Sequence, residues 1–274
     1  MGQELLEVKN LSVSFRMYQK AWKHTLVAGM HDVNLRLNEG EILAVVGASG
    51  SGKSLLAHAV LGILPYNAVM SGELLYRGSA LDAARQEKLR GRELALIPQS
   101  VTYLDPLMRV GKEVCGIHGT PAAMAATFRR LHLEDKVQRL YPFQLSGGMA
   151  RRVLFSTAVI TDAALIIADE PTPGMDVKSA VEALQLLREL ADAGKGVLLI
   201  THDIDLAVEV ADTVAVFYEG RTVDRIPAAA FRGDGSELQH PYTRALYHAL
   251  PQNSFTFYSA QEVQQMTAGG AGDA

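Results

Sequence analysis

The sequence predicts an α/β protein with an antiparallel β layer, a mostly parallel core sheet and an inserted helical subdomain. Three observations lead to this prediction. The chain begins with strand-like alternation of apolar and polar residues, short apolar runs then alternate with helical patterns, and a long middle stretch has helical cues but little strand character.

The antiparallel layer is predicted from two stretches near the start of the chain. Leu5–Phe15 alternates in the manner of a half-buried strand, and Asp32–Leu37 does so again before the turn Asn38-Glu39-Gly40. Two neighbouring strands of this type favour an antiparallel pair.

The core strands are predicted from three apolar runs that each end in polar residues. Ile42–Val46 precedes a glycine-rich loop, Leu165–Ala168 precedes two carboxylates, and Val197–Thr201 precedes a histidine and an aspartate. Ligands of open parallel sheets bind outside the carboxyl ends of the strands. The three polar clusters therefore predict one shared site.

The middle and the end of the chain are predicted to differ from this core. Thr120-Pro121 is a typical N-cap and first-turn pair, and we expect a helical subdomain at about residues 100–162. We expect it to be inserted in a single domain of residues 1–251. Residues 252–274 end in glycine and alanine without periodicity, which predicts a flexible C-terminal tail.

The composition excludes several classes of protein. The chain has 274 residues, enough to bury a core without cross-links, and Cys115 is its only cysteine, which excludes a disulfide or multi-thiolate scaffold. A net charge of −4 provides no general attraction to nucleic acid. The longest apolar run, Ala163–Ala168, is far shorter than a bilayer-spanning helix, and the first residues do not resemble a secretory signal. We expect a reduced, cytoplasmic protein.

A phosphate-binding loop is predicted between the first core strand and the helical run that follows it. The segment matches the pattern G-x-x-x-x-G-K-[ST], in which backbone N–H groups curl around phosphate oxygens. Lys53 is expected to reach the β- and γ-phosphates and Ser54 to bind Mg²⁺. The residues predicted to contact the phosphates are Gly47, Ala48, Ser49, Gly50, Ser51, Gly52, Lys53 and Ser54.

Two adjacent carboxylates follow the second apolar core run. Because side chains alternate along a strand, Asp169 and Glu170 are expected to point in different directions and to have different roles. We expect Asp169 to hold Mg²⁺ through its water shell and Glu170 to orient and deprotonate an attacking water.

A second glycine-containing helix start lies at Leu145-Ser146-Gly147-Gly148-Met149. Ser146 is a plausible N-cap, while Arg151 and Arg152 place cations in the first turn, where they oppose the helix dipole. A helix start that faces a phosphate fits this pattern, and a plain capped helix with solvated basic residues remains the alternative.

The order and spacing of these motifs resemble those of ATP-binding cassette (ABC) ATPases over about residues 4–251. The resemblance rests on the GxxxxGKS loop, Gln99 after LALIP, LSGGM, the strand ending in ADE, Asp176 and His202 after LLIT. It implies a P-loop NTPase of the ABC nucleotide-binding fold that hydrolyses ATP with Mg²⁺.

The resemblance also implies roles for individual residues. In this family ATP lies between two subunits arranged head to tail, so Ser146, Gly147 and Gly148 are expected to contact nucleotide bound to the partner. Gln99 is expected to sense Mg²⁺ and the attacking water, Asp176 to cross the dimer interface, and His202 to contact the γ-phosphate.

An aromatic residue near the end of the first strand stacks on adenine in this family. Phe15 is our prediction for that residue, with Tyr18 and Trp22 as alternatives. A core position on an alternating strand is the other interpretation of Phe15.

Met149 and the segment HPYTRAL at residues 240–246 resemble the oligopeptide, dipeptide and nickel group of ABC importers, in the short type without an iron–sulfur tail. The resemblance implies a peripheral subunit at the cytoplasmic face of the inner membrane. Its expected partners are permease subunits, a second ATPase subunit that is a paralogue or a copy of itself, and indirectly an extracytoplasmic solute-binding protein.

We expect nickel or a metal chelate slightly ahead of peptides as the solute. A soluble accessory ATPase, similar to those of carbon–phosphorus lyase assemblies, is the alternative.

Overall fold

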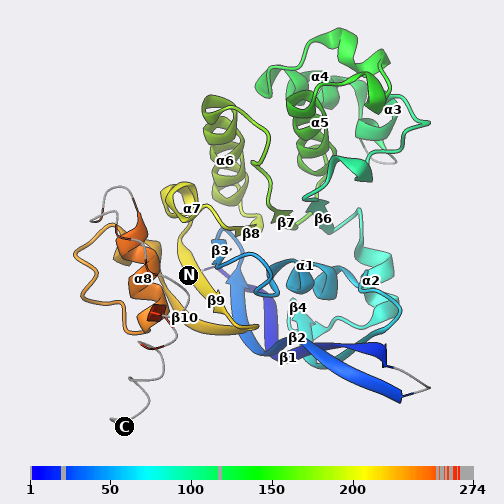
Figure 1. Cartoon of the computed structure of the whole chain (residues 1–274). Coiled ribbons are helices and arrows are strands. Elements are labelled where there is room, and N and C mark those ends of the chain that lie inside the picture. Colours follow the sequence, from blue (N-terminus) through cyan, green and yellow to red (C-terminus); the bar gives the residue numbers. More distant parts are fainter. Residues whose placement is uncertain are drawn as a thin grey trace.

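The computed structural model describes residues 2–19, 23–116 and 119–250, together with residues 253, 256, 258, 262, 263 and 265. Most of the segment predicted as a flexible tail therefore lies outside the described residues. The described part contains two β-sheets flanked by helices (Figure 1).

The smaller sheet is antiparallel and has the strand order β2-β1-β4-β5. Its strands are β1 (Glu4–Gln19), β2 (Lys23–Asn38), β4 (Ala68–Tyr76) and β5 (Ser79–Ala80).

The first hairpin is longer than the sequence predicts. β1 continues past Phe15 to Gln19, and β2 begins at Lys23, well before Asp32. Backbone pairing of β1 with β2 continues out to Gln19 and Lys23, beyond the stretch in which apolar residues are buried. The exposed Leu26 and Val27 lie in this extension. The alternation of apolar and polar residues in the sequence predicts only the part of the hairpin that packs on the core.

The larger sheet has the order β10-β9-β3-β8-β7-β6, and β9, β3, β8, β7 and β6 are parallel. Only β10 pairs antiparallel, with β9. The strands are β3 (Ile42–Val46), β6 (Leu94–Ile97), β7 (Leu165–Asp169), β8 (Gly196–Thr201), β9 (Thr213–Tyr218) and β10 (Arg221–Pro227).

Both faces of the larger sheet are covered, which explains why its central strands are continuous apolar runs. Along β3 the side chains alternate: Ile42, Ala44 and Val46 pack into one core cluster, and Leu43 and Val45 pack into the other. The first cluster includes residues of α6 (Val177–Asp192), α7 (Ile204–Val210) and α8 (Pro241–Ala249) and of the 3-10 turn Ala228–Phe231. The second joins α1 (Lys53–Leu61) and the smaller sheet to the opposite face.

A helical segment connects β6 to β7, and α2 (Ala83–Leu89) lies before β6. Among the described residues of this segment there is no strand, and the helices enclose an apolar cluster of their own that includes Phe128 and Val153. Thr120 caps one helix as the sequence predicts, because its side chain accepts a hydrogen bond from the Ala123 N–H at 3.1 Å. The helices are α3 (Val110–Cys115), α4 (Pro121–Arg130) and α5 (Gly147–Val159), with 3-10 turns at Val101–Tyr103, Asp135–Arg139 and Pro142–Gln144.

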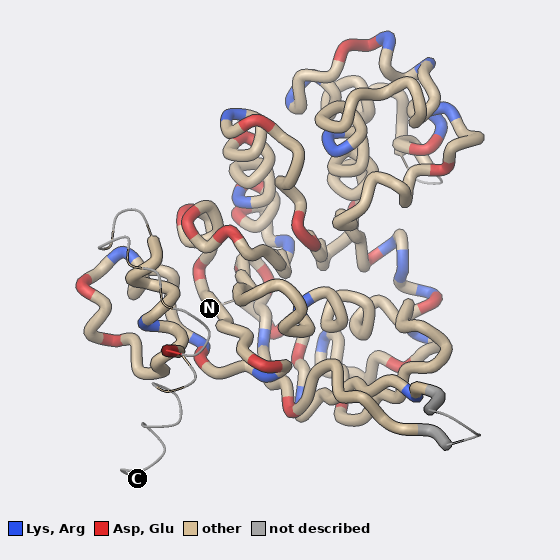
Figure 2. Tube along the Cα trace, viewed as in Figure 1, with Lys and Arg blue, Asp and Glu red and all other residues tan. Residues whose placement is uncertain are grey.

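Positive and negative side chains are mixed over the molecule. In Figure 2 neither sign covers one element or one side of the trace. No helix in the described ranges combines the length and apolar character that crossing a membrane requires.

Candidate functional site

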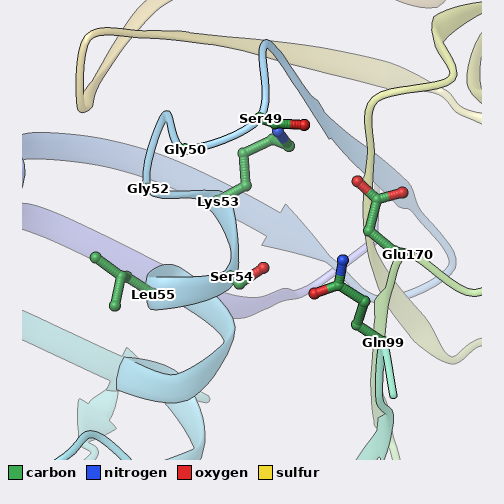
Figure 3. A pocket seen from close by; sticks show the side chains of 8 residues that line it. All are labelled: Ser49, Gly50, Gly52, Lys53, Ser54, Leu55, Gln99 and Glu170. Atoms are coloured by element: carbon green, nitrogen blue, oxygen red, sulfur yellow. The ribbon is translucent and has the colours of Figure 1, made fainter. Parts of the chain in front are cut away.

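A pocket of about 280 Å³ lies where β3 passes into α1 and faces the carboxyl ends of β6 and β7 (Figure 3). Most of its lining is polar. The lining residues are Ser49, Gly50, Gly52, Lys53, Ser54, Leu55, Gln99 and Glu170.

Close packing constrains the phosphate loop at two of its glycines. A Cβ atom on Gly47 would lie 2.2 Å from the Phe217 carbonyl oxygen, and one on Gly52 would lie 2.9 Å from the Gly29 carbonyl oxygen. Both glycines have a positive φ. No other residue fits these two positions without moving the backbone.

The Lys53 side chain curls back over the loop that precedes it. Its Nζ atom donates hydrogen bonds to the Gly47 oxygen at 2.7 Å and to the Ala48 oxygen at 2.9 Å. Burial lowers the pKa of Lys53, and the nearby Glu170 and Asp169 oppose this shift. The ammonium group is thus desolvated and held by carbonyl oxygens that phosphate oxygens can replace.

Ser54 and Asp169 bring two oxygen ligands together at the end of β7. The Ser54 hydroxyl donates to Asp169 Oδ1 at 3.0 Å, and Asp169 is 4% exposed. Burial raises the pKa of Asp169, and the Ser54 hydrogen bond and the neighbouring His58 oppose that rise. Hard oxygen donors of this kind suit Mg²⁺. In the same loop the buried Ser51 hydroxyl has no partner, so a polar ligand fits the loop better than an apolar one.

Glu170 lies immediately after β7 in an uncommon backbone conformation. Its φ is +47°, in the left-handed region, and its N–H donates to the Ile200 oxygen of β8 at 2.8 Å. The carboxylate is close to His202, whose Nδ1 is 2.9 Å from both carboxylate oxygens, and to the Thr201 hydroxyl at 3.4 Å. The ends of β7 and β8 therefore meet through side chains, as the sequence predicts for one shared site.

Gln99 lies two residues beyond β6 and is exposed to solvent. Figure 3 shows its amide on the same wall of the pocket as Glu170, facing the side that carries Lys53 and Ser54.

The residues of the second glycine-containing motif are not in the pocket. Ser146 caps α5, because its hydroxyl oxygen accepts a hydrogen bond from the Met149 N–H at 3.3 Å. A Cβ atom on Gly147 would meet nothing within 4 Å. The residue pair Gly147-Gly148 lies at the start of α5, on the helical segment, and does not line the phosphate loop pocket.

Asp176 also has a local structural role in this chain. It is the N-cap of α6, and its carboxylate accepts hydrogen bonds from the Ser179 N–H at 3.0 Å and the Ser179 hydroxyl at 2.7 Å. These bonds lower the pKa of Asp176. It remains exposed, so it is accessible to a second subunit.

Arg151 and Arg152, the cations in the first turn of α5, both have hydrogen-bond partners within the chain, and a helix start that faces a phosphate stays a prediction. Arg151 is 7% exposed and donates hydrogen bonds to the carbonyl oxygens of Pro98 at 2.8 Å, Pro173 at 3.2 Å and Gln99. Arg152 likewise donates to carbonyl oxygens, including that of Leu131. Backbone oxygens hold both guanidinium groups, while the carboxylates of Glu170 and Asp176 are near enough to interact electrostatically with Arg151 and Arg152 respectively. Sequence patterns do not reveal such long-range partners.

Phe15 packs in the core, next to the pocket. It is partly buried against the cluster that contains Leu56 and Val60, and it does not line the phosphate loop pocket. Of the alternatives, the side chain of Tyr18 and the whole of Trp22 lie outside the described residues. Stacking of Phe15 on adenine stays a prediction.

The phosphate loop also has a partner from a distant part of the chain. The hydroxyl oxygen of Tyr242, on α8, accepts a hydrogen bond from the Ala48 N–H at 3.0 Å. The two residues are 194 positions apart, and no local pattern connects them.

Comparisons with known proteins give a family match. The sequence model of the ABC transporter family matches residues 30–173. An oligopeptide transport ATP-binding protein, OppD, of Lactococcus lactis subsp. cremoris is 37% identical over 267 residues, which cover 91% of this chain and 77% of OppD. OppD of Bacillus subtilis is 34% identical, with 90% of this chain and 72% of that protein covered.

Solved structures show the same fold. A dimeric bacterial ABC transporter cassette superposes with a TM-score of 0.72 at 25% identity, and the match covers 82% of this chain and 99% of the cassette. A cassette in a post-hydrolysis state with ADP and Pi gives a TM-score of 0.71 at 24% identity, covering 82% of this chain and 99% of that one. By its sequence, fold and phosphate loop, the chain belongs to the ABC transporter family, as one of its ATP-binding cassette ATPases.

Proposed function

We propose that this chain is the ATP-hydrolysing subunit of a multi-subunit ABC importer that takes up peptides. The observation that carries the proposal is the arrangement at the carboxyl ends of β7 and β8, where Asp169 contacts Ser54 and Glu170 contacts His202 beside the phosphate loop. The names of the two OppD relatives support oligopeptides as the solute.

The phosphate loop and Lys53 hold the ATP phosphates in this proposal. The Lys53 ammonium exchanges the Gly47 and Ala48 oxygens for phosphate oxygens, and Ser54, Asp169 and Gln99 provide the ligands of Mg²⁺ directly or through water. Bound Mg²⁺ neutralises negative charge on the phosphates.

Glu170 is the general base of the proposed reaction. Its carboxylate accepts a proton from the attacking water, and Gln99 on the same wall orients that water. The Nδ1 atom of His202 contacts the Glu170 carboxylate. In the proposed reaction His202 also contacts the γ-phosphate. Positioning and electrostatic stabilisation provide most of the rate enhancement in such a site.

The proposed active form is a head-to-tail dimer of ATPase subunits. Ser146, Gly147 and Gly148 are exposed or half-buried at the start of α5, and Asp176 is exposed at the start of α6, so all four are accessible to a partner. The second subunit is a paralogue or a second copy of this chain. The dimer binds permease subunits at the cytoplasmic face of the membrane, and a solute-binding protein delivers the solute from the other side.

Two finer points concern the solute and the domain bounds. The relatives with a named solute transport oligopeptides, so they favour peptides and give no specific support to nickel; they also do not favour a soluble accessory ATPase. We further propose that residues 1–251 form one ATPase domain with the helical subdomain at about residues 100–162, since the helices there have a separate apolar cluster.

The test is to purify the tagged chain from detergent-solubilised membranes of its native host and to measure ATP hydrolysis by the recovered complex. We expect permease subunits to co-purify. We also expect Glu170→Gln to lower kcat by about 100-fold or more, since general-base catalysis provides that much. Glu189→Gln is the control, because this exposed glutamate of α6 pairs with Arg130 instead of the site. Unchanged turnover of Glu170→Gln contradicts the catalytic assignment, and recovery with soluble enzymes alone contradicts the transport assignment.

A further inference from the structure

The C-terminal helix α8 contacts the phosphate loop through one buried hydroxyl. Tyr242 is 7% exposed, and its hydroxyl oxygen accepts the Ala48 N–H at 3.0 Å. Burial raises the pKa of this phenol, so the hydroxyl stays protonated at neutral pH. The loop thus has a fixed partner outside the strand and helix that flank it.

The peptide group that donates to Tyr242 also accepts a hydrogen bond from Lys53. The carbonyl of the Gly47–Ala48 peptide accepts Lys53 Nζ at 2.7 Å, and the N–H of the same peptide donates to Tyr242. A peptide group is planar, so a partner that fixes the direction of its N–H also fixes the direction of its C=O. Tyr242 and Lys53 therefore hold opposite sides of one rigid unit.

Tyr242 is itself held in place by β9 and β10. Its ring lies on that of Tyr218 at the end of β9, with the ring centroids 4.4 Å apart. At the start of α8 the His240 N–H and the Thr243 hydroxyl both donate to Asp224 Oδ2 of β10. The Phe217 carbonyl of β9 also lies close to Gly47. The phosphate loop and the Tyr242 ring are therefore both packed against β9.

We propose that Tyr242 is a positioning residue of the nucleotide site, which sets the orientation of the Gly47–Ala48 peptide and through it the resting position of the Lys53 ammonium. The inference rests on the proposed function, in which this loop holds the ATP phosphates. A loop that is already ordered loses less conformational entropy when nucleotide binds. Loss of the hydroxyl therefore weakens binding without removing any group that touches ATP.

The test compares two tyrosines of the same helix. Tyr242→Phe removes the hydroxyl and keeps the ring. Tyr247→Phe is the matched control, because Tyr247 is 8% exposed and its hydroxyl donates to the Gly233 oxygen at 2.8 Å, away from the loop. Binding of Mg-ATP and Mg-ADP to the full chain is measured by calorimetry. We expect Tyr242→Phe to raise both Kd values about threefold to tenfold, the loss typical of one hydrogen bond. We expect less than a twofold change for Tyr247→Phe.

Hydrogen exchange at the Ala48 amide, followed by NMR without nucleotide, is the second measurement. Tyr242→Phe should speed exchange at this amide, and Tyr247→Phe should leave it unchanged. Melting temperatures of both variants show whether the fold is retained.

Each remaining outcome has one meaning. If the wild-type chain binds ATP, and Tyr242→Phe has the same Kd values and the same Ala48 amide exchange rate, the inference is overturned and the proposed function stands. Equal weakening by both variants also overturns it, because the effect then belongs to the helix as a whole. A wild-type chain that binds no ATP contradicts the proposed function, and the inference with it.

Discussion

The Nδ1 atom of His202 lies 2.9 Å from each carboxylate oxygen of Glu170. This contact joins the residue after β7 to the residue after β8. His202 has 58% of its side chain exposed, whereas Glu170 has only 9% exposed. Glu170 is therefore the buried partner of the contact and His202 the exposed one, which is the side chain that the proposed function assigns to the γ-phosphate.

Replacing His202 should lower the rate of hydrolysis more than it lowers nucleotide affinity. We expect His202→Ala to reduce kcat at least about tenfold, since the base loses the group that orients it and the γ-phosphate loses a contact. Steady-state ATPase assays and Kd measurements on the assembled complex separate the two effects.

His132→Ala is the control for that variant. His132 also pairs with a glutamate, Glu182, at 3.0 Å, but on an exposed surface of the molecule. Equal losses in the two variants would rule out a specific role for His202.

Removing the Arg151 guanidinium should destabilise the chain. We expect Arg151→Gln to lower the free energy of unfolding by about 2–4 kcal/mol, because three carbonyl groups lose a charged donor in a buried place. Urea unfolding measures the change. Arg129→Gln, at an exposed position of α4, should shift it by less than about 0.5 kcal/mol. A similarly small shift for Arg151→Gln would show that its hydrogen bonds do not contribute to the free energy of unfolding.

Neutralising Asp169 should stabilise the nucleotide-free chain while weakening Mg²⁺-dependent binding. Burial raises the folded-state pKa of Asp169 above the unfolded value, so the cost of this carboxyl to stability is absent below the unfolded pKa, grows as the pH rises, and is complete above the folded pKa. Asp169→Asn removes that cost and keeps an oxygen that can accept the Ser54 hydrogen bond. We expect about 1 kcal/mol of added stability at pH 7.5.

The pH dependence checks the sign of that prediction. The stability difference between Asp169→Asn and wild type should stay constant above the folded pKa of Asp169 and shrink as the pH falls through it toward the unfolded value, because the folded wild-type carboxyl then binds a proton. Thermal unfolding across this range measures it, and Asp135→Asn, at an exposed position, is the control. A difference that grows on acidification would contradict the assignment.

Adding one methyl group at Gly47 should disrupt the phosphate loop. We expect Gly47→Ala to abolish measurable nucleotide binding and to cost about 2–4 kcal/mol of stability, because its Cβ would lie 2.2 Å from the Phe217 oxygen. Gly78→Ala is the matched control, since Gly78 also has a positive φ of 70° but a Cβ there would meet nothing within 4 Å. Calorimetric binding and urea unfolding compare the two, and equal effects would point to backbone strain alone.

The predicted fold class is confirmed. The prediction depends on apolar runs and short motifs, which can be recognised locally in the sequence. Ile42–Val46, for example, is fully buried on both faces, so its apolar run and the loop motif that follows were visible without any knowledge of partners. The family resemblance is confirmed for the same reason, since its motifs are short and continuous.

Contacts between distant segments could not be predicted in this way. The sequence shows Arg151 only as a cation in the first turn of a helix, and the carbonyl groups that hold it lie 22 to 53 positions away in the chain. The Tyr242 hydroxyl meets the loop only because β9 and β10 bring α8 beside it. The length of the first hairpin was underestimated because its outer part is held by backbone pairing instead of burial.

The strand order has a consequence for how the protein is made. β3, which leads into the phosphate loop, pairs only with β8 and β9 in its sheet, and these strands begin at Gly196 and Thr213. A ribosome synthesises the N-terminal part first, so β3 emerges long before its neighbours exist. Until β8 and β9 follow, an apolar strand has two unpaired edges and is prone to aggregate. The edges of β3 therefore stay without their neighbours throughout the synthesis of the whole segment from α1 to α6.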